Sequence, residues 1–527
     1  MFLNLLLVLL GAGVLPDSGL RGLVTDQNGS TLSNIAVQLR INEHKTITVY
    51  TNQKGKFYFP EDLSLKTNKE VVAFGVGYET LIKQVSPDSR RLEFVLQSNP
   101  ELLTDQVSSS YFLSLLDNSL IKKEFLLDCS GCHQFSKKII SNNSGDLKSY
   151  DDWHQWTSQM LQFAGSLSSF PIMSPSRNAD ETAAWLVGEL ETNETKDIIT
   201  FLKKQNAGDI DQAIVTEYNI PISGDLPHDL MLDENGEVII TGMLTNQMYK
   251  LTPESGNFTK YPIPTSYSTP RALSLGSNGD WWVLLGNARS IGHFEPTDSS
   301  WTLSEIGAYP HSLVLDEPRN RIWFNAHFSR NPEWIGYLNL ITDEVTRYEV
   351  PISSMYDGGS TIPYGLIMDN DGIIWGTQLR GNRLLKFDPE SEDFDIYSMP
   401  TEMSGPRRPD SDALGRIWIP EYSANKLAVF YPGSEKFTEY EIPFADTLPY
   451  IVRVDDERKR VWIGTGAADA VLIFDIDSET FEKISLPTKS ALIRHMHLDK
   501  KTGELWVAYG NSPTDEAKVA HIELMDR

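Results

Sequence analysis

The chain has 527 residues, of which 40% are hydrophobic and 10% aromatic, so it is long enough to bury several separate cores. Acidic residues outnumber basic ones by 72 to 46, and the formal net charge of −26 argues against binding to nucleic acid or anionic lipid and favours cationic partners. The chain contains 2 cysteines, which excludes a disulfide framework as the source of its stability.

Residues 1–18 contain an apolar run of about 14 residues that ends in small and polar ones. This is the length of a signal-peptide core and is shorter than a membrane-spanning helix, which needs about 20 apolar residues. No Lys or Arg precedes the run, so an uncleaved anchor or a mis-assigned start stays open as an alternative. We expect a signal peptide at 1–18, export to the periplasm or secretion, and no integral membrane segment in the mature protein.

Residues 20–98 show short alternating strands separated by turn residues such as Asn28-Gly29 and Lys54-Gly55. The text from Gly22 to Gly29, the run "TNQKGKFYF" at 51–59 and the Gly77-Tyr78 pair resemble the carboxypeptidase regulatory-like family. The resemblance implies a small transthyretin-like β-sandwich that acts as a binding or spacer module without chemistry of its own.

Residues 107–206 change to a helical pattern, in which Trp153, Trp156, Met160 and Phe163 recur at the spacing of one helical face. Polar segments at 98–106 and 205–211 flank this region and predict hinged connections to its neighbours. The sequence therefore predicts a small all-α domain between two β domains.

Both cysteines lie in this helical region, in the motif Cys129-Ser-Gly-Cys132-His133. Thiols three residues apart can reach the two vinyl groups of one porphyrin, while the adjacent imidazole binds the iron. A redox dithiol would favour a βαβ context, and tetrahedral zinc needs four ligands, which this region does not supply. The motif predicts one covalently bound haem c, held by Cys129, Cys132 and His133.

The sixth iron ligand is expected to be a methionine, which gives a high reduction potential. The domain resembles class I-type small cytochromes c in which a tryptophan precedes the ligating methionine by seven residues, as Trp153 precedes Met160. The resemblance favours Met160 as a haem ligand with His133. Met173, in a proline-flanked loop, and His154 stay open as alternatives.

Residues 213–527 repeat at intervals of 40 to 53 residues, and each copy has an apolar position followed 12 or 13 residues later by another large apolar residue. A period of about 40–45 residues with four strand-like pieces indicates a β-propeller. The copies begin at Pro227, Pro270, Pro310, Pro363, Pro406, Pro449 and Ile493. Six copies end in a fourth strand, the seventh lacks one, and matching text at 215–221 precedes the first copy. We expect seven blades, with 215–221 completing the last.

The residue after each copy's first position is polar and mostly bulky. Because inner strands line the channel of a propeller, these seven side chains are expected to converge near one mouth. They are His228, Arg271, His311, Tyr364, Arg407, Tyr450 and Arg494. Glu421 follows a blade tryptophan by three residues and is predicted to join the three arginines in a site for an anionic or polyhydroxylated ligand, with Glu421 or a histidine as base.

The runs "LPHDLMLDENGEVIITGM", "IPYGLIMDNDGIIWGTQL" and "RIWIPEYSANKLAVF" resemble the virginiamycin B lyase (streptogramin lyase) family. The resemblance implies a seven-bladed propeller, and a carbon–oxygen lyase that opens a cyclic ester with a histidine base and a carboxylate-bound Mg²⁺. It carries over catalytic roles to Glu421, His228 and His311. The family's W-x-x-E text occurs once, at Glu421, so the fold follows more firmly from the resemblance than the chemistry does.

The sequence as a whole predicts a multidomain, mainly β protein: a sandwich at 20–98, a cytochrome c-like domain at 107–206 and a propeller at 213–527. We expect an exported c-type cytochrome for electron transfer, whose propeller binds a redox partner protein or a small ligand at its channel. The alternative is a lyase or hydrolase of a lactone or cyclic ester with an accessory haem. Whether the chain is an enzyme, either such a lyase or a haem-coupled oxidoreductase, stays open at this point.

Overall fold

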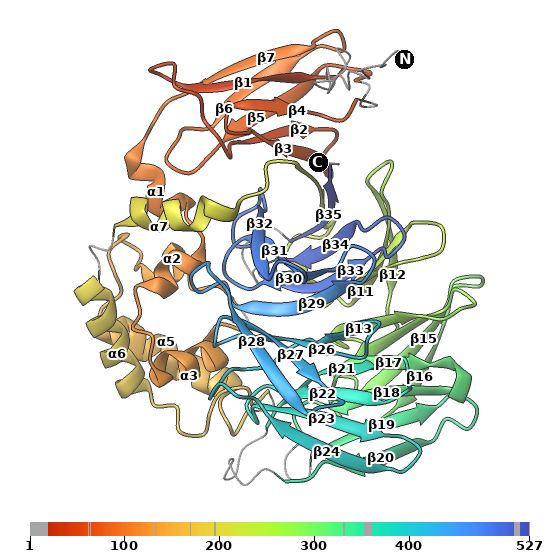
Figure 1. Cartoon of the computed structure of the whole chain (residues 1–527). Coiled ribbons are helices and arrows are strands. Elements are labelled where there is room, and N and C mark those ends of the chain that lie inside the picture. Colours follow the sequence, from red (N-terminus) through yellow and green to blue (C-terminus); the bar gives the residue numbers. More distant parts are fainter. Residues whose placement is uncertain are drawn as a thin grey trace, which may run out of the picture.

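The structure is a computed structural model that describes residues 19–525, except 62, 64, 132, 169, 194–196, 330–332, 353–360 and 511–516. The predicted signal peptide at 1–18 and Cys132 lie outside the described residues. Figure 1 shows a β-sandwich at one end, a group of helices along one side and a large β-propeller.

The N-terminal strands form two sheets that share one core. Sheet β4-β1-β7 packs on strands ordered β3-β2-β5-β6, with Val24, Val37, Phe57, Val71 and Phe94 fully buried between them. The strands are β1 (Arg21–Asp26), β2 (Ala36–Arg40), β3 (Lys45–Tyr50), β4 (Lys56–Tyr58), β5 (Lys69–Phe74), β6 (Leu81–Val85) and β7 (Arg91–Leu96).

The helical region packs around buried aromatic side chains. Helix α5 begins with a capping box in which Ser149 and Asp152 bond each other's backbone N–H groups, and it turns Trp153 into the core. The helices are α1 (Leu103–Gln106), α2 (Ser109–Ser114), α3 (Leu120–Cys129), α4 (Lys137–Ile140), α5 (Tyr150–Ala164), α6 (Ala179–Asn193) and α7 (Ile198–Gln205), with 3₁₀ turns at Pro100–Leu102, Asn206–Gly208 and Glu317–Arg319. The longest have 15 residues, and none in the described part of the chain has the length and hydropathy of a transmembrane span.

The remaining strands form seven four-stranded antiparallel blades within the described residues; six are separate sheets, and the seventh is part of a larger sheet. Blades one to three are β9 (Pro227–Leu232), β10 (Val238–Gly242), β11 (Gln247–Thr252), β12 (Asn257–Pro262); β13 (Pro270–Leu275), β14 (Trp281–Leu285), β15 (Ser290–Glu295), β16 (Ser300–Glu305); β17 (Pro310–Asp316), β18 (Arg321–Ala326), β19 (Trp334–Asn339), β20 (Val345–Glu349). Blades four to six are β21 (Pro363–Met368), β22 (Ile374–Gln378), β23 (Arg383–Asp388), β24 (Asp393–Ser398); β25 (Asp410–Ser411), β26 (Ile417–Glu421), β27 (Lys426–Tyr431), β28 (Lys436–Glu441); β29 (Pro449–Asp455), β30 (Arg460–Thr465), β31 (Ala470–Asp475), β32 (Thr480–Ser485).

The seventh blade joins both ends of the repeat. Its strands are β33 (Ile493–Leu498), β34 (Leu505–Tyr509), β35 (Lys518–Leu524) and β8 (Ala213–Asn219), and β8 pairs antiparallel with β35 from Ala213↔Leu524 to Asn219↔Lys518. Inner strand β33 also contacts β9 of the first blade. The predicted seven blades and their closure by the strand that precedes the first copy are confirmed.

The closing blade continues into the N-terminal sandwich. Strand β3 pairs antiparallel with β8, from Lys45↔Tyr218 to Thr48↔Val215, so one sheet of eight strands runs through both regions. An exposed strand edge would invite pairing with other chains, and the sandwich covers it here.

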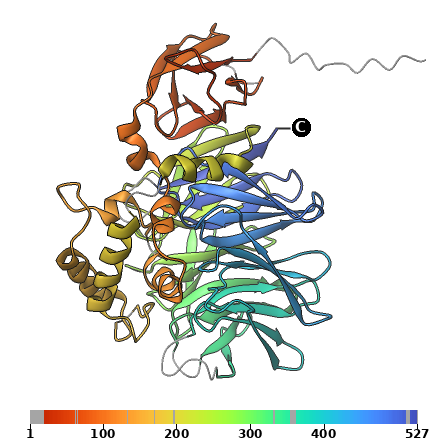
Figure 2. The same ribbon diagram turned by 60° about the vertical axis from the view of Figure 1, so that its left-hand side comes forward.

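The segment at 205–211, predicted as a hinge, is held against the propeller instead. Asp209 forms an ion pair with Lys483 at 3.0 Å, and Ile210 N–H donates to the Lys483 carbonyl. Figure 2 shows from a second side that the helices lie over one face of the propeller, with the sandwich above its closing blade. The three regions therefore form one continuous assembly, with cores that merge between helices and propeller.

Candidate functional site

In six of the seven blades, the polar residue of the predicted ring lies at an irregularity in strand pairing. In these blades the inner strand pairs with the second strand at its first residue, and regular pairing resumes two or three residues later. The ring residue lies in the unpaired step between them. In the fifth blade regular pairing starts only at Asp410, after an isolated bridge between Pro406 and Glu421. A bulge releases its extra residue from the pleat and redirects the side chain, and such features recur next to functional sites.

All seven predicted ring residues line one cavity of about 470 Å³, so their convergence is confirmed. This volume lies within the range of about 300–1,000 Å³ for sites that hold small molecules and cofactors. The ring residues in its wall are His228, Arg271, His311, Tyr364, Arg407, Tyr450 and Arg494.

The cysteine motif lines the same cavity from the helical side. Helix α3 begins at its N-cap Ser119 and ends at Cys129, and Cys129, Ser130, Gly131 and His133 all contribute to the wall. The helices thus close the channel mouth with the one segment of the chain that the sequence assigned to a cofactor. This juxtaposition of distant segments could not be read from either motif alone.

His133 is placed as a neutral ligand would be. Its Nδ1 is buried without a hydrogen-bond partner in the described structure, and its ring lies 6.2 Å from that of Trp156. Burial lowers the pKa of His133, so the imidazole is neutral at neutral pH and keeps a lone pair for a metal. An imidazole and a thioether are donor types that hold haem iron, and thiols can attach to the vinyl groups of the porphyrin.

Both candidate methionines line the cavity. Met160 projects from α5 and is half-buried, whereas Met173 is only 3% exposed and its N–H donates to the Ala164 carbonyl at 2.9 Å. His154 is not part of the wall; its Nε2 lies 3.5 Å from Asp180 on the outer side of α5. The geometry brings Cys129, His133, Met160 and Met173 together and leaves the choice between the two sulfurs open.

The helical wall of the cavity is apolar and aromatic. Trp153 is 3% exposed and stacks on Phe135 at 6.0 Å, and Phe125, Ile139 and Leu186 complete this wall. An apolar and aromatic wall suits the faces of a flat ring system, and the imidazole and thioether side chains in it are ligand types for haem iron, so the wall and these side chains fit a porphyrin.

Ion pairs fix the motif to the propeller. Asp128, next to Cys129, pairs with Arg177 of the helical region at 2.6 Å and with Arg380 of the propeller, and these side chains are 5% exposed or less. Tyr422 Oη donates to the Ser130 carbonyl at 2.7 Å. Sequence reasoning missed these residues because nothing in the local text indicates a partner so far along the chain.

Of the predicted catalytic residues, His228 and His311 line the cavity and Glu421 does not. His228 Nδ1 lies 2.6 Å from Asp229 Oδ1, and Asp229 also pairs with Arg408 at 3.0 Å. Burial lowers the pKa of His228 to about 3 and that of His311 well below its usual value, so both imidazoles are neutral at neutral pH. A carboxylate-oriented neutral histidine could accept a proton from a substrate.

Glu421 does not line the cavity with the three arginines with which the sequence grouped it. It is fully buried at the end of β26, opposite Lys426 in the ladder and near Glu439. Burial, with the nearby Glu439 charge, raises the pKa of Glu421 to about 8, so it is mainly protonated at neutral pH. A protonated carboxyl is a poor base and a poor ligand for Mg²⁺.

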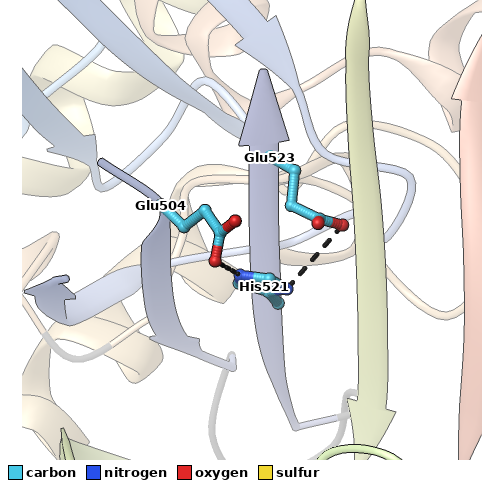
Figure 3. Close-up of side chains that lie close together, drawn as sticks. All are labelled: Glu504, His521 and Glu523. Atoms are coloured by element: carbon cyan, nitrogen blue, oxygen red, sulfur yellow. Dashed lines mark hydrogen bonds and ion pairs between the residues drawn. The ribbon is translucent and has the colours of Figure 1, made fainter. Parts of the chain in front are cut away.

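A second group of side chains, outside the cavity wall, could hold a metal ion. Figure 3 shows His521 between Glu504 and Glu523 on neighbouring strands of the closing blade. His521 Nε2 lies 3.1 Å from Glu504 and Nδ1 lies 3.9 Å from Glu523, and Trp506 stacks on the ring. Both ring nitrogens face carboxylates, so the cluster is explained as a surface ion-pair network.

One further wall residue is His327, which directly follows β18. Its Nδ1 lies 2.7 Å from the Pro363 carbonyl, and its ring stacks on His311 at 4.4 Å. His327 follows the strand that contains Trp323, and this position in the repeat could have been used to predict that it lines the channel.

No family model matches the chain, and no curated protein matches its sequence. Among solved structures, a streptogramin B lyase aligns with 21% identity over 59% of this chain and 98% of its own, with a TM-score of 0.53. Virginiamycin B lyase from Staphylococcus aureus aligns with 22% identity over 59% of this chain and all of its own, at a TM-score of 0.51. A catalytically inactive histidine-to-alanine variant of that enzyme, solved with quinupristin, gives 21% identity, 59% and 100% coverage, and 0.51. The propeller of this chain therefore has the fold of the virginiamycin B lyases.

Proposed function

We propose that the protein is an exported c-type cytochrome whose single haem sits over the mouth of a ligand-binding propeller. The observation that carries this proposal is the shared cavity, in which the Cys129–His133 motif faces the seven polar residues of the propeller ring. The proposal includes a domain organisation in which the chain has a signal peptide, a regulatory-like sandwich, a cytochrome domain and a propeller. Covalent haem attachment outside the cytoplasm would agree with the apolar segment at 1–18.

The residues have distinct roles under this proposal. Cys129 and Cys132 would tether the haem, and His133 would supply a nitrogen ligand from a neutral, buried imidazole. Trp153 and the other apolar side chains exclude water, and the Asp128 ion pairs keep the motif against the channel mouth. When bound, the haem supplies reversible one-electron transfer. A substrate or redox partner would meet this group from the propeller side.

A redox titration of the haem-loaded protein, in which absorbance reports the oxidation state, tests the axial ligand. We expect a midpoint potential well above zero for His/Met ligation, and a large fall in the Met160→Ala variant because an imidazole–thioether pair favours the reduced iron. Met173→Ala is the matched control, since it removes a second sulfur from the same wall. A fall only in Met173→Ala would assign the ligand to Met173, and a low potential in the unmodified protein would contradict methionine ligation altogether.

A lyase or hydrolase acting on a lactone or cyclic ester is the second candidate. The hydrogen bond between Asp229 and the wall residue His228 favours it. We expect His228→Ala to abolish any ring opening of such a substrate while the haem spectrum stays unchanged, and His311→Ala to reduce it. Glu421→Gln should leave turnover close to normal, because Glu421 lies outside the wall. Activity that survives both histidine changes would remove this candidate.

A further inference from the structure

The propeller side of the cavity carries an excess of positive charge. Among the described residues of the wall, Arg271, Arg407 and Arg494 are the guanidinium groups and Asp128 is the carboxylate. Asp128 is already engaged in ion pairs with Arg177 and Arg380, which lie outside the wall. The protein as a whole has a formal charge of −26, so this cationic mouth runs against its composition.

Arg407 is a rigid part of this mouth. Its guanidinium lies 3.8 Å from the ring centre of Tyr422 and 4.4 Å from that of Tyr450, and Nη1 donates to Tyr364 Oη at 2.6 Å. A Cβ on Gly131 would lie 3.1 Å from Arg407 Nη2, so the guanidinium touches the loop between the two cysteines. The side chain is therefore fixed in place at the cofactor motif before any ligand arrives.

Arg271 is held in a similar way at another blade. Its Nε donates to Tyr309 Oη at 2.8 Å, and the guanidinium lies over the rings of Tyr309 and Phe170 at 5.2 and 5.8 Å. The neighbouring histidines add hydrogen-bonding groups without charge, because burial lowers the pKa of His228 and His327 to about 3. The positive charge of the mouth thus comes from arginines that are aligned by aromatic rings.

Fixed arginines in a largely buried wall select a particular ligand chemistry. A guanidinium matches a carboxylate in two parallel hydrogen bonds, and a buried cation is stabilised by a partner anion. The facing wall, with Trp153, Trp156 and Met173, is apolar. The two walls together suit a carboxylate carried on a flat apolar body.

We propose that Arg271 and Arg407 bind a carboxylate group in the cavity that they share with the haem-motif loop, so that the propeller supplies the anion-binding half of a composite site. This inference rests on the proposed haem function only for the identity of the group on the helical side. The carboxylate can come from two sources, the propionate groups of the haem itself or a diffusible aromatic carboxylate.

The test uses the haem-loaded full chain and benzoate as the probe. If the carboxylate is diffusible, benzoate shifts the Soret band of the unmodified protein, and its affinity falls by about 10- to 100-fold in Arg271→Gln and in Arg407→Gln. If it is a propionate, benzoate has no effect, and the pH at which the midpoint potential changes rises in both variants, because loss of a cation raises a carboxyl pKa. Arg407→Lys keeps the charge and should show a smaller change than Arg407→Gln.

Arg289→Gln is the matched control, since Arg289 is exposed between β14 and β15 and is not part of the wall. It should behave as the unmodified protein does. The proposal is overturned if neither the benzoate affinity nor the pH at which the midpoint potential changes depends on Arg271 or Arg407. It is also overturned if Arg289→Gln has the same effect as the other two substitutions. A colourless protein would remove the haem proposal instead, and calorimetry of benzoate with that protein would still decide whether the arginines bind a carboxylate.

Discussion

A Cys129→Ser, Cys132→Ser double variant is expected to be colourless under conditions in which the unmodified chain is red. Co-expression with haem-maturation machinery should give the unmodified protein c-type bands in its ferrous spectrum. Serine hydroxyls are close in size to thiols but do not form the thioether bonds, so the variant loses its covalent haem completely. Absorbance of the purified proteins, at equal concentration, measures this.

Ser130→Ala is the control for the cysteine variant. It changes the same loop but keeps both thiols and His133, and the Ser130 contact to Tyr422 uses the backbone carbonyl, which remains. We expect full haem content. Covalent haem in the double serine variant, or equal loss of colour in Ser130→Ala, would contradict attachment through the two cysteines.

An Asp128→Asn change is expected to cost about 3–5 kcal/mol in the free energy of unfolding, because it removes the nearest anion of two buried guanidinium groups. Arg177 would keep only its longer contact with Glu124, at 3.7 Å. Arg177 and Arg380 approach Asp128 from the helical region and from the propeller, and each side chain is 5% exposed. The helices should then separate from the channel mouth at lower denaturant concentration. Urea unfolding followed by tryptophan fluorescence measures the change.

The surface pair Lys386–Asp395 gives the matched control for this buried one. Its atoms lie 2.9 Å apart, but the side chains are 31% and 57% exposed, so water already screens the charges. Asp395→Asn should cost about 0–1 kcal/mol. If Asp128→Asn unfolds at the same urea concentration as Asp395→Asn, the Asp128 cluster does not hold the two regions together.

The repeat architecture could be predicted from sequence because its signals are local. The spacing of Trp282, Trp323, Trp375, Trp418 and Trp462 marks successive second strands, and the "VTEYNIP" text marks the strand that closes the ring. The convergence of the ring residues followed from the same register. The irregular strand pairing at these residues could not be predicted, because a β-bulge depends on how two strands pair and leaves little signal in the sequence of either strand.

The composite cavity could not be predicted, since it depends on how separate regions pack. The Asp128–Arg380 pair and the approach of Arg407 to Gly131 join segments that are remote in sequence. Glu421 illustrates the opposite case. Its position in the repeat placed it with the arginines, but the strand turns it into a dry neighbourhood beside Glu439, away from the wall. The repeat spacing therefore predicts the strand on which a residue lies, whereas its side-chain contacts depend on the packing of the folded chain.

The proposed function depends above all on a covalent haem that the Cys129–His133 motif carries at the mouth of the propeller. Peptide mass spectrometry of the matured protein tests it most directly, by locating any haem on the chain. We expect one haem on the proteolytic peptide that contains both cysteines, and none elsewhere. Recovery of that peptide with two unmodified thiols, from cells that mature other c-type cytochromes, would contradict it.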